Sequence, residues 1–82
     1  MIKIMLSDSV KGGSATGTTV LDEEGNTIED VAKIVLTLAP GSVEAEIVTA
    51  ERKGGNLVLD SKGAVATKTN LYPEAEIYMS KG

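Results

Sequence analysis

Residues 33–49, KIVLTLAPGSVEAEIVT, carry the clearest structural signal of the chain. Alternate positions on both sides of Pro40-Gly41 hold the side chains of one strand face, as expected for extended segments with a period of two. These residues are Ile34, Leu36, Leu38, Val43, Ala45, Ile47 and Thr49. Proline pre-sets the first corner of a tight turn and glycine suits the second. The stretch therefore predicts a β-hairpin with one apolar and one mostly polar face.

Upstream of this hairpin, the sequence predicts two shorter strands joined by a glycine-rich loop. Apolar side chains alternate over residues 2–6, which indicates a first strand. Residues 7–17 hold three glycines and several hydroxyl side chains, so we expect a flexible loop or hairpin arm there. A second strand is expected over residues 18–22, followed by a turn at residues 23–26.

Residues 27–34 are compatible with two structures. Apolar side chains at positions 28, 31 and 34 fit one short helical turn near residues 28–34, which Thr27 would cap. An extended approach to the central hairpin is the other reading, and we favour it because isolated helices shorter than about 12 residues are marginal.

Downstream of the hairpin, glycine and proline positions divide the chain into short segments. Gly54-Gly55 and residues 61–63 predict turns that flank a strand over residues 56–60, with residues 64–67 as its hairpin partner. Residues 70–74, which include Pro73, are expected to form a connector, and residues 75–79 a last strand. The expected fold is all-β or nearly so: a small antiparallel β-sandwich or barrel with a central β-hairpin, in one domain spanning residues 1–82.

Size and composition exclude several function classes. The chain has 82 residues, a formal net charge of −4, and no Cys or His. It therefore lacks a disulfide framework, a thiol nucleophile and the commonest general base. Its acidity argues against a nucleic-acid polymer as partner, because that binding depends on neutralising phosphates. A domain of this size has a marginal core, so we expect it to self-associate as a homo-oligomer.

The glycine-rich segment is the leading candidate for a ligand site. Backbone N–H groups, hydroxyl groups and a lysine suit an anion such as phosphate, and the candidate residues are Lys11, Gly12, Gly13, Ser14 and Thr16. The segment is not a P-loop, because its lysine precedes the glycines and a strand rather than a helix follows. The alternative is a mobile hairpin tip without a ligand.

Arg52 and Lys53 form the only basic doublet, and Arg52 is the only arginine of the chain. A guanidinium group presents a planar fork that fits carboxylate or phosphate. Tyr72 and Tyr78, the only aromatic residues, are candidates for stacking against a nucleotide base. The alternatives are a charged hairpin loop for the basic pair and partly buried core positions for the tyrosines.

Acidic residues cluster over residues 22–30 and recur in pairs at Glu44 and Glu46 and at Glu74 and Glu76. The cluster lacks the ligand spacing of a calcium loop, and we interpret it as a solvated turn. The pairs fit the hydrated face of a half-buried sheet better than the carboxylates of a glycosidase. We therefore expect no enzyme activity, no catalytic residue, no metal site and no cofactor.

The opening residues are apolar over too short a stretch for a signal peptide, and no run of about 18 apolar residues predicts a membrane span. We therefore expect a cytoplasmic protein that has no membrane partner.

The opening strand and the central hairpin together resemble a pattern in small tailed-phage and prophage accessory proteins. The resemblance covers roughly residues 1–50, and this chain departs from the pattern in the insert at residues 11–17. The residues that carry it are Met1-Ile2-Lys3-Ile4, then Ile28, Val31, Ile34, Leu36 and Leu38, then Pro40-Gly41, and finally Ala45, Ile47 and Val48. It implies a short accessory protein that acts by binding to host machinery, virion partners or a signalling ligand. If phage-encoded, the protein would act in the host cytoplasm.

Three functions follow from these observations. The first is a non-catalytic protein-interaction module of phage-accessory type that acts as a homo-oligomer, with an unknown protein partner. The alternative is a protein that sequesters a small phosphorylated ligand, in particular a nucleotide, where the glycine-rich segment and Arg52 meet at a subunit interface. The third is a structural subunit of a particle.

Overall fold

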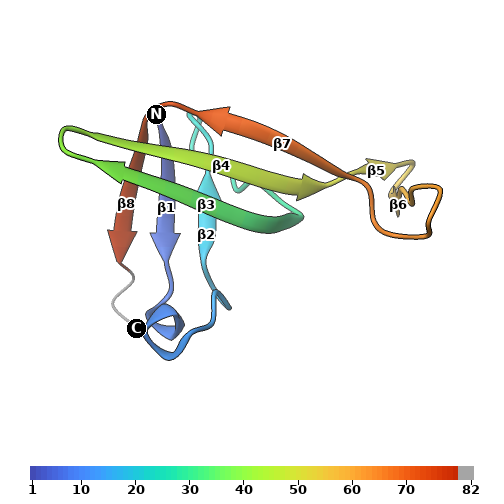
Figure 1. The fold of residues 1–82 in the computed structure, drawn as a ribbon, viewed down its shortest axis with the longest axis horizontal. Helices are drawn as coiled ribbons and strands as arrows, with labels where there is room; N and C mark the ends of the chain where they lie inside the picture. Colours follow the sequence, from blue (N-terminus) through green and yellow to red (C-terminus); the bar gives the residue numbers. More distant parts are fainter. Residues whose placement is uncertain (80–82) are drawn as a thin grey trace.

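The computed structural model describes residues 1–79, and most of them lie in strands. The elements in Figure 1 are β1 (Ile2–Leu6), the 3-10 helix η1 (Asp8–Gly12), β2 (Thr19–Leu21), β3 (Val31–Ala39), β4 (Ser42–Ala50), β5 (Arg52–Lys53), β6 (Asn56–Leu57), β7 (Thr67–Tyr72) and β8 (Ala75–Met79). The prediction of an all-β fold is confirmed. Two three-stranded sheets, ordered β2-β1-β8 and β3-β4-β7, carry the core, and β5 and β6 form a third, two-stranded sheet.

The predicted central hairpin is confirmed as β3 and β4. Ala39 pairs with Ser42 across the Pro40-Gly41 turn, and Gly41 has a φ of 84°, which a glycine adopts without strain. On the face predicted to be apolar, Ala45 and Ile47 are fully buried. Leu38 belongs to that face by register but is 71% exposed, because it pairs with Val43 next to the hairpin turn. The tip of the hairpin extends past β8 in Figure 1.

The third strand of this sheet corrects one prediction. Residues 70–74 were expected to form a connector, but Asn70, Leu71 and Tyr72 belong to β7. Tyr72 pairs with Ala45 and Asn70 with Ile47, so β4 supplies backbone partners that extend the strand to Pro73. The connector is therefore only Pro73-Glu74.

The other sheet contains the one parallel strand pair among the described residues. β1 pairs antiparallel with β2 and parallel with β8, in a register that places Ile4 between Val20 and Ile77. The connector after β7 passes from one sheet to the other, so that β8 enters beside β1 in the same direction (Figure 1). The sandwich is thus antiparallel except along β1 and β8.

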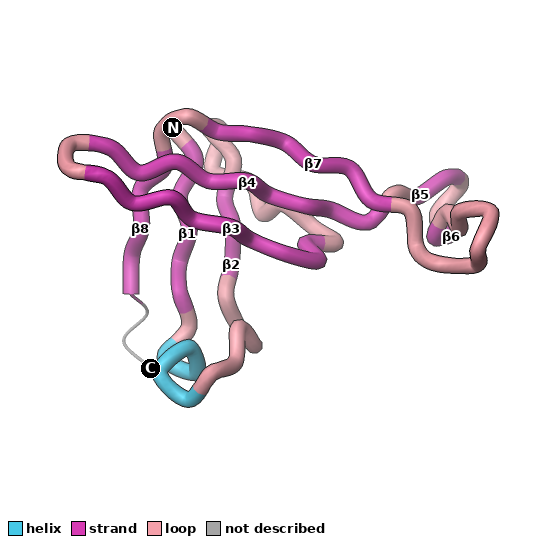
Figure 2. The backbone as a smooth tube through the Cα atoms, viewed as in Figure 1, coloured by secondary structure: helices cyan, strands magenta, loops and turns pink. Residues whose placement is uncertain are grey.

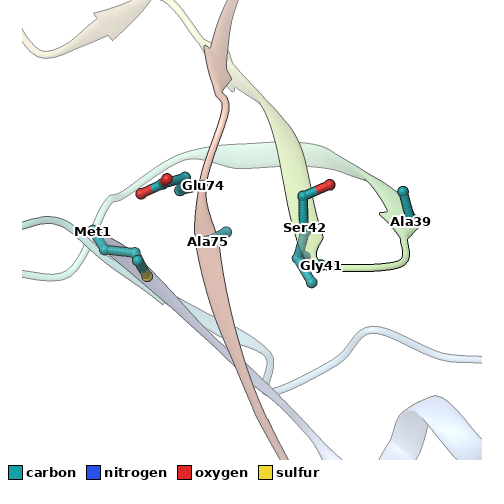
Figure 3. A pocket seen from close by; sticks show the side chains of 7 residues that line it. Met1, Ala39, Gly41, Ser42, Glu74 and Ala75 are labelled. Atoms are coloured by element: carbon teal, nitrogen blue, oxygen red, sulfur yellow. The ribbon is translucent and has the colours of Figure 1, made fainter.

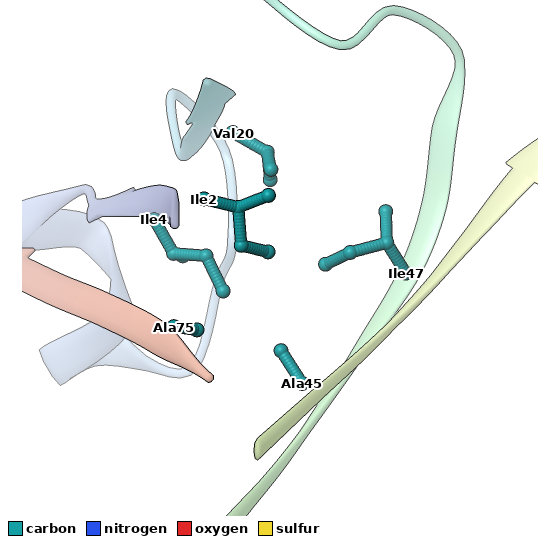
Figure 4. Packing of buried hydrophobic residues seen from close by; sticks show 6 residues of the cluster. All are labelled: Ile2, Ile4, Val20, Ala45, Ile47 and Ala75. Atoms are coloured by element: carbon teal, nitrogen blue, oxygen red, sulfur yellow. The ribbon is translucent and has the colours of Figure 1, made fainter. Parts of the chain in front are cut away.

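The core lies where the two sheets face each other (Figure 4). Its buried members are small or β-branched and come from both sheets: Ile2, Ile4, Val20, Ala45, Ile47 and Ala75. No buried aromatic side chain contributes among the described residues, so the buried apolar volume is small. A core of this kind gives a marginal stabilisation, because apolar area removed from water is the main favourable contribution.

The helical turn lies in a different place from the one considered as an alternative. Residues 27–30 are extended or irregular and lead into β3, as favoured from the sequence. Within residues 1–79 the one helical turn is η1, inside the glycine-rich loop, where the Ser7 hydroxyl accepts a hydrogen bond from the Ser9 amide at 3.1 Å. Gly13 ends it in the left-handed region with a φ of 85°, which explains a glycine there.

The turn after β2 is built by Asp22. Its carboxylate accepts hydrogen bonds from the amides of Glu24 and Asn26 at 3.0 and 2.9 Å, and Gly25 takes a φ of 86°. The predicted turn at residues 23–26 is therefore confirmed.

Residues 51–66, called the arm below, project beyond both sheets (Figure 2). Gly54-Gly55 forms the predicted turn between β5 and β6, with φ values of 60° and 84°. The predicted strand over residues 56–60 is shorter than expected, since only Asn56–Leu57 is a strand and Leu59 makes an isolated bridge to Val65. The arm gives the molecule its longest dimension, 40 Å against 26 and 24 Å.

Candidate functional site

The glycine-rich segment uses many of its polar groups internally. The amides of Gly13 and Ser14 donate to the carbonyls of Val10 and Ser9 at 3.0 and 3.1 Å, and the Thr16 amide donates to the Ser14 hydroxyl at 3.2 Å. The ammonium group of Lys11 lies 3.1 Å from the Asp8 carboxylate. An anion at this loop would therefore compete with bonds that already satisfy these donors.

Arg52 is bound by groups of its own chain. Its Nε and Nη2 donate to the two carboxylate oxygens of Asp30 at 2.8 and 3.1 Å, and its Nη1 donates to the Gly55 carbonyl at 3.0 Å. The hydrogen bonds from Nε and Nη2, together with the charge of the guanidinium group, hold the pKa of the Asp30 carboxyl below its usual value. A phosphate at Arg52 would have to displace a carboxylate that already fills the fork of the guanidinium group.

The other candidate residues lie at separate places. Lys53 is exposed on β5, and Tyr72 is half-buried at the end of β7. Tyr78 is 43% exposed on β8, where its hydroxyl donates to the carboxylate of Glu76. This hydrogen bond raises the pKa of Tyr78, because it stabilises the protonated phenol.

Within one chain, these residues do not form one site. Figure 1 places the glycine-rich segment below β1 and β2, whereas β5, which contains Arg52, lies at the base of the arm. Their meeting across a subunit interface, as the nucleotide hypothesis requires, stays a prediction. Among the candidates, Tyr72 lines one of two adjoining surface hollows, and none of the others lines either of them.

Those two hollows adjoin each other at the end of the sandwich opposite the arm, and we call them together the end hollow. They have volumes of about 470 and 350 Å³ and share Met1, Ser42 and Glu74. Figure 3 shows the larger one between the start of β8 and the β3–β4 turn. Apolar groups of Val43, Ala75 and Tyr72 complete much of the lining, and the carboxylate-bearing residues are Glu23 and Glu74.

Sequence reasoning did not single out the end hollow, because its residues come from segments far apart in the chain. It also missed the arm as an apolar surface. Leu57, Leu59 and Val65 are 44%, 58% and 41% exposed there, and the Leu59–Val65 bridge places two of them directly opposite each other. The alternation of Leu57 and Leu59 can be recognised in the sequence, but the sequence does not show that these side chains are exposed.

Among residues 1–79, no group of three or more acidic side chains is placed to hold a metal ion, and no helix is long and apolar enough to cross a membrane. Searches of protein-family models, of curated proteins and of solved structures find no match to this chain.

Proposed function

We propose that this protein is a non-catalytic protein-interaction module of phage-accessory type that acts as a homo-oligomer in the cytoplasm. Its phage-accessory character rests on the resemblance of residues 1–50. Its mode of action, binding through self-association, rests on the surface that a single chain leaves exposed.

The observation that carries the proposal is an excess of accessible surface. The chain exposes 5778 Å², whereas a compact monomer of 8.5 kDa exposes about 4,700 Å² by the scaling of area with mass. The excess, roughly 1,100 Å², exceeds the roughly 800 Å² that each partner buries in an interface of standard size. The radius of gyration, 13.8 Å, likewise exceeds the roughly 12 Å expected for a compact domain of this length.

Apolar side chains contribute to this surface. Ten large apolar or aromatic side chains of the described residues are at least 37% exposed, against six residues in the buried core. Single exposed apolar residues are ordinary, but their gathering on a projecting segment is typical of a binding surface. The arm has three of them, which points to burial against another protein chain.

The nucleotide hypothesis has less support. Arg52 is occupied by Asp30, and the end hollow that Tyr72 lines carries Glu23 and Glu74. The ammonium group of Met1 lies 3.8 Å from the Glu23 carboxylate and offsets its charge, but Glu74 would still repel a phosphate bound in this hollow. The absence of His and Cys from the sequence supports binding over catalysis.

Sedimentation velocity over a wide range of protein concentration tests the proposal, together with native mass spectrometry of protein that has never been unfolded. We expect a defined oligomer that dissociates on dilution and carries no adduct. A folded monomer throughout the range would contradict the proposal. An adduct of a few hundred daltons would favour the nucleotide alternative, and very large ordered assemblies would favour a particle subunit.

A further inference from the structure

We infer that the ion pair between Arg52 and Asp30 is a latch that fixes the direction in which the arm leaves the sandwich. When the pair is broken, the arm turns as one unit about its base at Glu51 and Ala66, while the sandwich keeps its structure. This inference concerns a single chain, so it holds or fails independently of the proposed self-association.

Hydrogen bonds attach the arm to the rest of the described chain at one place. Arg52 donates from Nε and Nη2 to the two carboxylate oxygens of Asp30, at 2.8 and 3.1 Å. The other hydrogen bonds that the arm makes within residues 1–79 join residues of the arm to each other. In the same part of the chain, this contact is also the one ion pair that links the arm to a residue outside it.

Apolar packing adds little to this attachment. Among the described residues, none from the arm belongs to the buried core or to the half-buried side chains packed against it. Only Val58 and Ala66 of the arm are half-buried, and the others are exposed. Because buried apolar area is the main source of stabilisation, a segment that lacks it is held in position by its polar contacts.

Asp30 holds the chain on both sides of Glu51, where the arm begins. Its backbone carbonyl accepts a hydrogen bond from the amide of Ala50, the last residue of β4, at 2.8 Å. Its side chain binds Arg52, the first residue of β5. The two contacts together fix the path of the chain as it passes from β4 into the arm.

The arm is held together by bonds of its own. At its base, Val58 donates its amide to the Glu51 carbonyl at 3.0 Å, and Ala66 donates to the Val58 carbonyl at 2.8 Å. Farther out, the Asp60 carboxylate accepts from the Lys62 amide at 2.8 Å. None of these bonds crosses to the sandwich, and the arm stands clear of both sheets (Figure 2). A rotation at the base therefore leaves all of them intact.

The latch combines a defined geometry with an exposed position. Two hydrogen bonds between a guanidinium group and a carboxylate add orientation as well as energy. The Arg52 and Asp30 side chains are nevertheless 45% and 30% exposed, and water competes with ion pairs at such positions. The latch is therefore specific in direction and easily opened. It sets the direction in which the arm presents the exposed side chains of Leu57, Leu59 and Val65.

Distances between spin labels, measured by electron paramagnetic resonance, test the latch. The chain contains no cysteine, so two introduced cysteines are its only labelling sites. Ser61→Cys in the arm and Thr37→Cys on β3 form the arm pair, and Thr37→Cys with Glu24→Cys forms a reference pair within the sandwich. All three positions are exposed. Labelled protein is diluted with an excess of unlabelled protein, so that distances between copies do not contribute.

Asp30→Asn and Arg52→Lys open the latch from its two sides. Asparagine tolerates the positive φ at this position, and lysine keeps the charge but not the two parallel hydrogen bonds. Asp8→Asn is the matched control, because it breaks another exposed ion pair, the one with Lys11 at 3.1 Å. We expect one narrow distance for the arm pair in wild type and in the control. In the two latch variants, the population at other distances should rise about twofold to fivefold, the effect of removing one exposed ion pair.

A narrow distance for the arm pair in either latch variant, or a broad one already in wild type, would overturn the inference. Equal broadening in Asp8→Asn, or broadening of the reference pair along with the arm pair, would also overturn it, because either would mean a general loosening of the fold. Broadening confined to the arm pair in both latch variants supports it. Sedimentation velocity of wild type decides the proposed self-association separately, whichever way the arm behaves.

Discussion

The guanidinium group of Arg52 donates two hydrogen bonds to the carboxylate of Asp30, 22 positions earlier in the chain, at 2.8 and 3.1 Å. Asp30 precedes β3 and has a φ of 59°, in the left-handed region that aspartate tolerates better than most residues. Its carbonyl also accepts the Ala50 amide at 2.8 Å, at the end of β4. This pair therefore joins the beginning of the central hairpin to the base of the arm.

Breaking this pair by pH should destabilise the protein. The folded-state pKa of Asp30 is lowered from 3.8, chiefly by the hydrogen bonds from Arg52. Its contribution to the free energy of unfolding is thus fully present above pH 3.8 and is lost as the pH falls through the lower folded-state value. Urea denaturation followed by circular dichroism at neutral and acidic pH measures the change.

Asp30→Asn is the matched variant, because asparagine also tolerates positive φ and keeps a hydrogen-bond acceptor. It should be less stable than wild type at neutral pH, and the difference should shrink as the pH falls below 3.8. A difference that stays constant through this range would mean that the ion pair does not contribute.

Truncation of Ile47 should be the most damaging change in the central hairpin. Ile47 is fully buried between the sheets, and Ile→Ala substitutions at such positions cost about 2–5 kcal/mol of unfolding free energy. Ile47→Val should cost only about 0.5–1.5 kcal/mol, because a smaller cavity is left.

Leu71→Ala is the exposed control for this series and should change the free energy of unfolding by less than about 0.5 kcal/mol. Chemical denaturation of all three variants provides the comparison. Equal effects at Ile47 and Leu71 would contradict the assignment of the core.

Gly41→Ala should destabilise the hairpin turn. No atom lies within 4 Å of the added Cβ, so the cost arises from the backbone alone, at a φ of +84°. The left-handed conformation costs a residue with a side chain about 1–2 kcal/mol. Gly12→Ala has equally open surroundings without a positive φ and should be close to neutral. Thermal denaturation of the two variants separates conformational strain from steric contact, and a loss of stability in both would point to contacts instead.

Tyr78 should ionise above the ordinary value of 10.0, since its hydroxyl bond to Glu76 raises its pKa. A raised pKa favours the folded state below pH 10, and this contribution is lost as the pH rises through the folded-state value. Ultraviolet absorbance of the phenolate follows the titration of both tyrosines. The part of the absorbance change that is lost in Tyr78→Phe belongs to Tyr78.

Glu76→Gln provides the control for this titration. It removes the charged acceptor, so the midpoint of Tyr78 should move back toward 10.0. A midpoint that is unchanged in Glu76→Gln would show that the carboxylate is not the cause.

Strand positions were predictable wherever neighbours in sequence decide them. The alternation around Pro40-Gly41 predicted β3 and β4, and the turns at Gly25 and Gly54-Gly55 followed from the conformational freedom of glycine. The end of β7 was not predictable in this way. Pro73 and its neighbours predicted a connector over residues 70–74, but pairing with β4, as between Tyr72 and Ala45, extends the strand to Tyr72.

The candidate site was less predictable than the fold. Arg52 was noticed as the sole arginine, but its occupation by Asp30 depends on a contact between residues remote in sequence. The end hollow likewise combines Met1, Ser42 and Glu74 from three distant segments.

The amino-acid sequence by itself determined the all-β class, the central hairpin and its buried face, because strand periodicity and turn chemistry depend on adjacent residues. Only the tertiary structure decided that β8 runs parallel to β1, that the arm stands clear of the sheets with Leu59 exposed, and that a hollow forms at the opposite end. These features depend on which remote segments bury each other's apolar surface, and local patterns carry no information about that choice.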